Sequence, residues 1–187
     1  MALVYSDPKT WDVSEMANAV LMNQYARDNL LASVHRLKRK QVDESINNST
    51  TLQNDDELFW PLGASETWYF RVFISILQTE TGPGAKIAFT IPSGTVMAMN
   101  SPVNDDAGFV YQRGRWETSG NAVIAYSNAT DGDVRYNEAT SIDIDGIVTS
   151  STTTGNLQLQ WAQSASVASN VMTVLADHSQ IWGMKLS

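Results

Sequence analysis

The chain has 187 residues, a net charge of −8 and no cysteine. This length fits one domain with an appendage, and the missing cysteine excludes disulfides, thiolate zinc sites and cysteine nucleophiles. Residues 51–187 carry six basic and fourteen acidic residues, which argues against nucleic acid or an anionic membrane as the main partner.

The first residues, MALVYSDPKTW, have neither the basic start nor the long apolar run of a secretion signal. The later apolar stretches are all too short to span a membrane. The sequence therefore predicts a soluble protein of a reducing compartment, or of a particle assembled in one.

The first predicted element is a helix over residues 14–37, which contain no Gly or Pro. Lys38, Arg39 and Lys40 follow it, where cations suit the negative end of the helix dipole. Two columns of residues recur at spacings of seven, as in a heptad seam: Val13, Val20, Arg27 and Val34, and Met16, Asn23, Leu30 and Leu37.

The apolar stripe of this helix has two interpretations. It is either a self-associating seam or one face of a single amphipathic helix that packs on this chain or on another protein. In both cases residues 1–40 form an arm for anchoring or oligomerisation, and the interface residues that we predict are Val20, Leu30, Val34 and Leu37.

Residues 41–57, QVDESINNSTTLQNDDE, are polar and predict a linker. Asp55, Asp56 and Glu57 end this segment, directly before the aromatic stretch LFWPL. Runs of charge at a strand entrance usually keep a loop solvated and protect a sheet edge. We therefore interpret the three acids as a solvated surface and not as a catalytic or metal-binding cluster.

From residue 58 onward the apolar period changes to two, which is typical of strands. In ETWYFRVFISIL one face is apolar throughout and the other is mixed, so this strand is expected to be covered for part of its length. Further short strands alternate with turn sequences, with no helix among them. The fold class predicted for residues 58–187 is an antiparallel β-sandwich or jelly roll behind a helical arm.

Aromatic side chains suggest both core and contact positions. Trp60, Trp68, Trp161 and Trp182 lie in alternating strands and are expected in the core. Trp116 lies in QRGRWETSG, which looks like a turn, and with its neighbours Arg113 and Arg115 it forms our candidate for an exposed contact.

No motif for catalysis or cofactor binding is present in the sequence. The two histidines, His35 and His178, are far apart in sequence and have no second His or Cys nearby. The acids of DGDVRYNE lack the pattern of a calcium loop, and Asp143 and Asp145 alternate with isoleucines on the outward face of a strand. We predict no enzyme activity, no metal and no cofactor.

The order of these segments resembles that of small virion proteins of tailed bacteriophages. TWDVSEMANAVLMNQYARDNLLAS is similar to their N-terminal segment, and TTLQNDDELFWPLGASETWYFRVFI to the start of their β-domain. NLQLQWAQ is similar to a late strand and VMTVLADHSQIWGMKL to their closing hairpin. The resemblance spans most of the chain and rests on helical and strand patterns.

This resemblance implies a non-enzymatic structural component of a virion assembled in the host cytoplasm, often trimeric. The arm would attach it to other virion proteins, such as the major capsid protein. Capsid decoration proteins, head fibres and tail fibres share the layout, and the short body favours decoration or a head fibre. The alternative is a receptor-binding module that recognises a host surface glycan.

Overall fold

The computed structural model describes residues 35–80, 84–105, 108–116, 124–126 and 139–187, with the backbone alone for 102–105, 108–116 and 124–126. Within these residues the chain is mainly β. The strands are β1 His35–Arg39, β2 Glu44–Asn47, β3 Gln53–Leu62, β4 Thr67–Gln78, β5 Ala85–Thr90, β6 Val96–Asp105, β7 Gly108–Trp116, β8 Ile124–Tyr126, β9 Thr140–Thr149, β10 Gly155–Gln163, β11 Val171–Val174 and β12 Gln180–Lys185.

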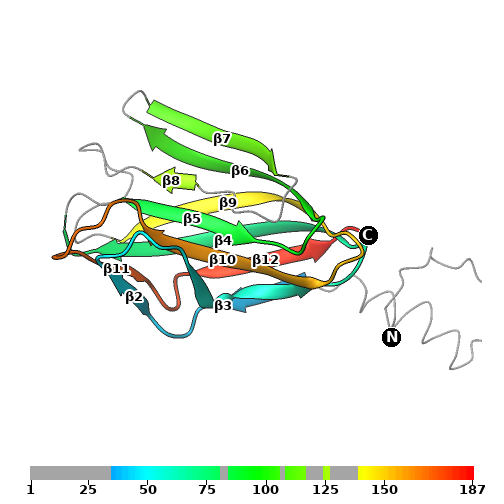
Figure 1. Ribbon diagram of the computed structural model, residues 1–187, viewed down its shortest axis with the longest axis horizontal. Coiled ribbons are helices and arrows are strands. Elements are labelled where there is room, and N and C mark those ends of the chain that lie inside the picture. Colours follow the sequence, from blue (N-terminus) through cyan, green and yellow to red (C-terminus); the bar gives the residue numbers. More distant parts are fainter. Residues whose placement is uncertain (1–34, 81–83, 106–107, 117–123, 127–138) are drawn as a thin grey trace, which may run out of the picture.

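The strands form two antiparallel sheets. The larger has the order β1-β12-β4-β9-β6-β7, with β11 paired to β4 and β2 paired to β11. The smaller has the order β3-β10-β5-β8. Figure 1 shows β5 and β10 crossing over β4, β9 and β12, and the sheets share one core, so the arrangement is sandwich-like.

The core consists of the side chains that point inward from alternate positions of the strands, as the sequence predicts. The inward face of β4 is fully apolar: Trp68, Phe70, Val72, Ile74 and Ile76 are all buried. Trp60 of β3 lies 6.0 Å from Trp68 between ring centroids, and Phe89 of β5 lies 5.6 Å from Phe70. Trp161 is also buried, which confirms the core position expected of three tryptophans.

The segment expected to end the helical arm is a strand from His35 onward. β1 pairs with β12 from His35↔Met184 to Arg39↔Gln180 and is an edge of the larger sheet. The predicted helix is therefore wrong for residues 35–37, and the cations that follow do not cap a helix. Pairing with a strand about 145 residues later in the chain overrides the local helix propensity. The rest of the arm lies outside the described residues.

The segment predicted as a linker is also part of the β-body. β2 pairs with β11, and β3 begins at Gln53 inside the polar stretch. Polar residues are compatible with these strands because β2 lies at a sheet margin, where charged and polar side chains face solvent. β1, β2 and the first part of β3, which were expected in the arm and the linker, thus belong to the β-body.

Candidate functional site

The run of three acids lies in a bulge of β3. Gln158 of β10 pairs with Phe59, and Gln160 of β10 pairs with Asn54. Between these two pairs the chain covers five positions in β3 but only two in β10. The extra residues leave the ladder, and their backbone N–H groups need other acceptors.

Asp55 supplies those acceptors. Its Oδ1 accepts hydrogen bonds from the backbone N–H of Glu57 at 3.0 Å and of Leu58 at 2.9 Å. The buried amide of Gln158 donates to the Asp55 carbonyl at 2.8 Å. Asp55 is only 1% exposed, so the prediction that it belongs to a solvated surface is wrong. Asp56, the next residue, is exposed as expected.

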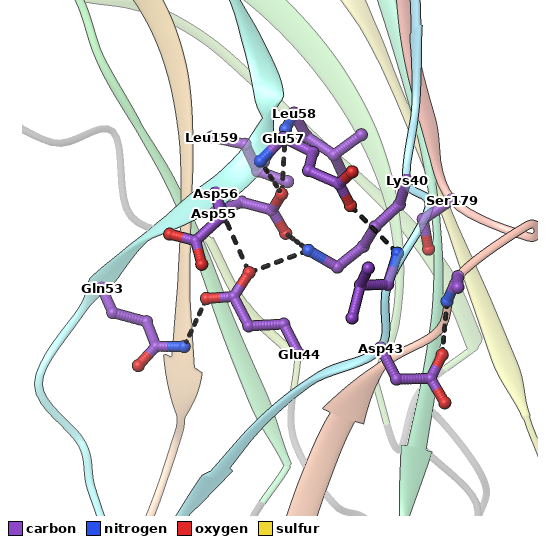
Figure 2. A network of polar contacts seen from close by, with 12 residues as sticks. Lys40, Asp43, Glu44, Gln53, Asp55, Asp56, Glu57, Leu58, Leu159 and Ser179 are labelled. Atoms are coloured by element: carbon purple, nitrogen blue, oxygen red, sulfur yellow. Dashed lines mark hydrogen bonds and ion pairs between the residues drawn. The ribbon is translucent and has the colours of Figure 1, made fainter.

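Lys40 completes the cluster, as Figure 2 shows. Its ammonium, on a residue only 1% exposed, donates to Asp55 Oδ2 at 2.9 Å and to Glu44 Oε2 at 2.8 Å. Glu44 also accepts from Gln53 Nε2 at 2.9 Å and from the backbone N–H of Asp56 at 3.2 Å. The cluster therefore joins the end of β1, β2 and the bulge of β3.

The electrostatics of the cluster favour a charged lysine. Burial lowers the pKa of Lys40, but hydrogen bonds to Glu44 and Asp55 and their negative charges outweigh burial and raise that pKa above its usual value. The ammonium lies where the two carboxylates converge, so it occupies the place that a metal cation would need. In the described part of the chain, no group of three His, Asp or Glu is arranged to hold a metal.

A second polar cluster lies at the start of β4. The carboxylate of Glu66 accepts from the backbone N–H of Gly63 at 2.8 Å, from Trp68 Nε1 at 3.0 Å and from Lys185 Nζ at 3.0 Å. Burial raises the pKa of Glu66, but these hydrogen bonds and the charge of Lys185 outweigh it and lower the pKa below the usual 4.5.

We expect Glu66 to make the stability of the protein depend on pH. Because its pKa is lower in the folded chain, it stabilises the fold above the unfolded value of 4.5, and this contribution is lost as the pH falls through the folded pKa. With Glu66→Gln, the free energy of unfolding should decrease less steeply than in the unmodified protein as the pH falls below about 5. Urea titrations at fixed protein concentration over a series of pH values measure this dependence. An unchanged slope would contradict this role.

The outward face of the larger sheet carries a different set of side chains. The strand register places Tyr69 of β4 between Met184 of β12 and Ile147 of β9, and it places Arg71 between Trp182 and Asp145. Trp182 is half-buried on this face and is not in the core, which corrects the expectation for this residue. Its ring meets that of Tyr69 edge to face, with 5.5 Å between centroids.

An open groove of about 550 Å³ lies on this face. Its lining comes from β4, β6 and β9: Tyr69, Ala98, Met99, Asn100, Asp145, Gly146 and Ile147. Gly146 permits the close approach of β6, because a Cβ there would lie 2.3 Å from the Ala98 carbonyl oxygen. Burial and the charge of Asp145 raise the pKa of Tyr69 above its usual value.

Two arginines on the outward face are paired with carboxylates of the same chain. The guanidinium of Arg71 makes a two-pronged contact with the Asp143 carboxylate, with Nε to Oδ1 at 2.8 Å and a second bond from Nη2 to Oδ2. This pairing raises the pKa of Arg71. Arg39 likewise contacts Asp177, with 3.2 Å between Nη2 and Oδ1. Asp145 lines the groove beside the Arg71–Asp143 pair and accepts a 3.4 Å hydrogen bond from Asn100 Nδ2, so the middle of the face carries an additional carboxylate among its apolar side chains.

The residues proposed as sites from the sequence fall in different places. Leu37 lies on β1 opposite Trp182, at the border of the outward face, and is 61% exposed. Val20, Leu30 and Val34 lie outside the described residues. Arg113, Arg115 and Trp116 are not in a turn as predicted: they belong to β7, where Trp116 pairs with Met97 of β6.

Sequence reasoning missed the larger part of this site. The mixed character of the second face of β4 was visible as Tyr69, Arg71 and Phe73 alternating with the core residues. The partner strands β12 and β9 could not be assigned from that pattern, because alternation does not show which strands are neighbours.

Comparisons with known proteins place the chain in no family. No family model matches it, and no curated protein matches it. A chain from the structure of infectious bursal disease virus, Gt strain, aligns at 10% identity and a TM-score of 0.17, over 82% of this chain and 41% of that chain. That match spans less than half of the viral chain, and at this TM-score it supports no conclusion. The described residues include no helix long and apolar enough to cross a membrane.

Proposed function

We propose that the protein is a non-enzymatic structural component of a tailed-phage virion, a trimeric capsid decoration or head-fibre protein with a jelly-roll-like body. Its N-terminal helical arm holds it to other virion proteins such as the major capsid protein. The protein needs no cofactor and binds neither nucleic acid nor membrane. Its location is the virion, assembled in the host cytoplasm.

One observation carries this proposal. In the sequence, the segment that resembles the arm of tailed-phage virion proteins stands directly before β1, an edge strand of an antiparallel β-body. In this proposal residues 1–34 attach the protein to the particle, and the β-body, which includes β1, projects from it. Among the described residues, the buried core cluster runs from Ile46 to Ile181.

We expect mass spectrometry of purified virions to detect the full chain, in hundreds of copies for a decoration protein and a handful for a tail component. A variant lacking residues 1–34 should keep its β-type circular dichroism and be absent from the particles. Absence of the full chain from particles would refute the virion assignment. Incorporation of the shortened chain would place attachment in the β-body.

The alternative function is a tail-fibre or receptor-binding module for a host surface glycan. One feature favours it: Trp116 has two arginines within three residues of it in the sequence. All three belong to β7, which is an edge strand of the larger sheet. A glycan array separates the two functions, because a capsid cement retains no sugar and a receptor-binding module retains a few. Loss of such retention in Trp116→Ala would assign the site.

A further inference from the structure

The carboxylate of Asp145 has unused capacity to accept hydrogen bonds. Asp145 of β9 lies opposite Arg71 of β4 in the strand register, but the guanidinium of Arg71 binds Asp143 instead. Asp145 Oδ1 accepts a hydrogen bond from Asn100 Nδ2 at 3.4 Å, which is longer than the usual length of about 2.7–3.2 Å. In the part of the chain that the structure describes, no basic side chain forms an ion pair with Asp145.

This carboxylate lies in a groove whose other walls are mainly apolar. Tyr69, Ile147 and Ala98 form a row across β4, β9 and β6, because Ile147 pairs with both of the others. Asp145 precedes Ile147 by two residues in β9, so its side chain points to the same side of the sheet. All four residues line the groove of about 550 Å³. A molecule that fits it needs an apolar or flat body and a hydrogen-bond donor at one end.

We propose that this groove receives an arginine side chain of a partner protein, with the guanidinium on the Asp145 carboxylate and the methylene stem along Tyr69 and Ile147. The inference goes beyond the proposed function, which assigns attachment to the arm. It adds a separate contact that the β-body makes, and it does not rest on the virion assignment.

The charge distribution favours a cation as the occupant. The chain carries −8 overall, so its field attracts cations and repels anions. Apolar walls lower the local dielectric, which strengthens the attraction between Asp145 and a counter-ion. The carboxylate also acts on the groove wall, since burial and the charge of Asp145 raise the pKa of Tyr69. A neutral sugar would leave this charge without a counter-ion.

The shape and composition of the groove favour arginine over lysine. The planar guanidinium binds a carboxylate through two parallel hydrogen bonds, and Arg71 already binds Asp143 in this way on the same face. Arginine also stacks on aromatic rings such as that of Tyr69, and its methylene groups pack on apolar side chains. The ammonium of lysine is more strongly hydrated and loses more on entering an apolar groove.

The test uses two peptide probes and the full chain. The first is a blocked peptide with one arginine between glycines, and its twin carries citrulline, the neutral analogue of arginine. Each is titrated onto protein with labelled isoleucine methyl groups, and the methyl signals are followed by NMR. Ile147, which is 46% exposed, reports on the groove, and Ile142, buried in the same strand, is the internal control.

Two variants separate the groove from the overall charge of the protein. Asp145→Asn removes the carboxylate in the groove, and Asp56→Asn removes an exposed carboxylate of β3, so each variant loses one negative charge. Circular dichroism establishes that both are folded.

We expect the arginine peptide to shift the Ile147 signal saturably and to leave the Ile142 signal in place. The citrulline peptide should bind at least about tenfold more weakly, and Asp145→Asn should raise the dissociation constant of the arginine peptide by a similar factor, because each change removes one charge of the pair. Asp56→Asn should leave that constant within about twofold, because salt screens a distant exposed charge.

Three results would overturn the proposal. The first is the absence of a saturable shift at Ile147 with the arginine peptide. The second is equal binding of the citrulline twin, or equal losses in the two variants, because binding would then follow apolar contact or overall charge. The third is a response of Ile147 to lactose and not to the arginine peptide, which would make the groove a sugar site.

These results are independent of the test of function. Arginine binding by a chain that is absent from virions would support the groove and refute the virion assignment. A virion protein whose groove does not respond to the arginine peptide would retain the function and refute this inference.

Discussion

Asp55→Ala should lower the free energy of unfolding by about 3–5 kcal/mol, as for the loss of one member of a buried ion pair. The substitution removes the buried partner of Lys40, which is 1% exposed, and leaves the ammonium with Glu44 alone. It also removes the acceptor of the backbone N–H groups of Glu57 and Leu58 in the bulge of β3. Urea denaturation at fixed protein concentration measures the loss.

The neighbouring acid provides the matched control. Asp56 is exposed, so Asp56→Asn should change the free energy of unfolding by no more than about 0.5 kcal/mol. Equal effects at positions 55 and 56 would mean that both carboxylates are solvated, and the buried cluster would be refuted.

A double-mutant cycle separates the charge of Asp55 from its role in the bulge. Asp55→Asn keeps a side-chain oxygen for the two backbone N–H groups and removes the charge, and Lys40→Met removes the ammonium. The double variant should be less destabilised than the sum of the single variants, because neither buried charge is then left without the other. Strict additivity would show that Lys40 and Asp55 do not interact.

Trp60→Ala should also cost about 3–5 kcal/mol, through the cavity left between the sheets. The indole is 1% exposed, lies 6.0 Å from Trp68 and fills the space above Gly183, where a Cβ would come within 2.7 Å of its ring. The loss is measured by urea denaturation with circular dichroism as the signal.

Two further variants test the same packing. Trp60→Phe should cost clearly less than Trp60→Ala, because the smaller aromatic ring still fills part of the space. Gly183→Ala should destabilise by about 1–3 kcal/mol, because its methyl group overpacks against the Trp60 ring and the Tyr69 carbonyl. Tolerance of Gly183→Ala together with a small effect of Trp60→Ala would mean that the sheets are not packed at this point.

The fold class could be predicted where residues alternate strictly. The pattern Trp68, Phe70, Val72, Ile74 and Ile76 determined both the strand β4 and its inward face, because successive side chains of a strand point to opposite sides. Short strands separated by turns were expected after β4 for the same reason, but the second half of β6 was not predicted and the end of β7 was expected as a turn. These signals are local, so a single sequence is enough to detect them.

The boundary of the body could not be predicted in this way. HRLKR and ESIN carry too few apolar residues to show a strand period, and both become strands by pairing with β12 and β11, which lie far later in the chain. Edge strands are commonly polar, which makes them hard to distinguish from linkers and helix ends.

By itself, the sequence determined an acidic, cysteine-free chain with an antiparallel β-body, because charge, composition and period-two alternation are properties of neighbouring residues. Only the tertiary structure decided which charges are buried and which apolar residues stay exposed. Lys40, Glu44 and Asp55 meet because β1, β2 and the bulge of β3 converge, and Leu37, Ile147 and Met184 share a face because β1, β12, β4 and β9 lie side by side. Both outcomes depend on strand order and register, which long-range hydrogen bonding and core packing select.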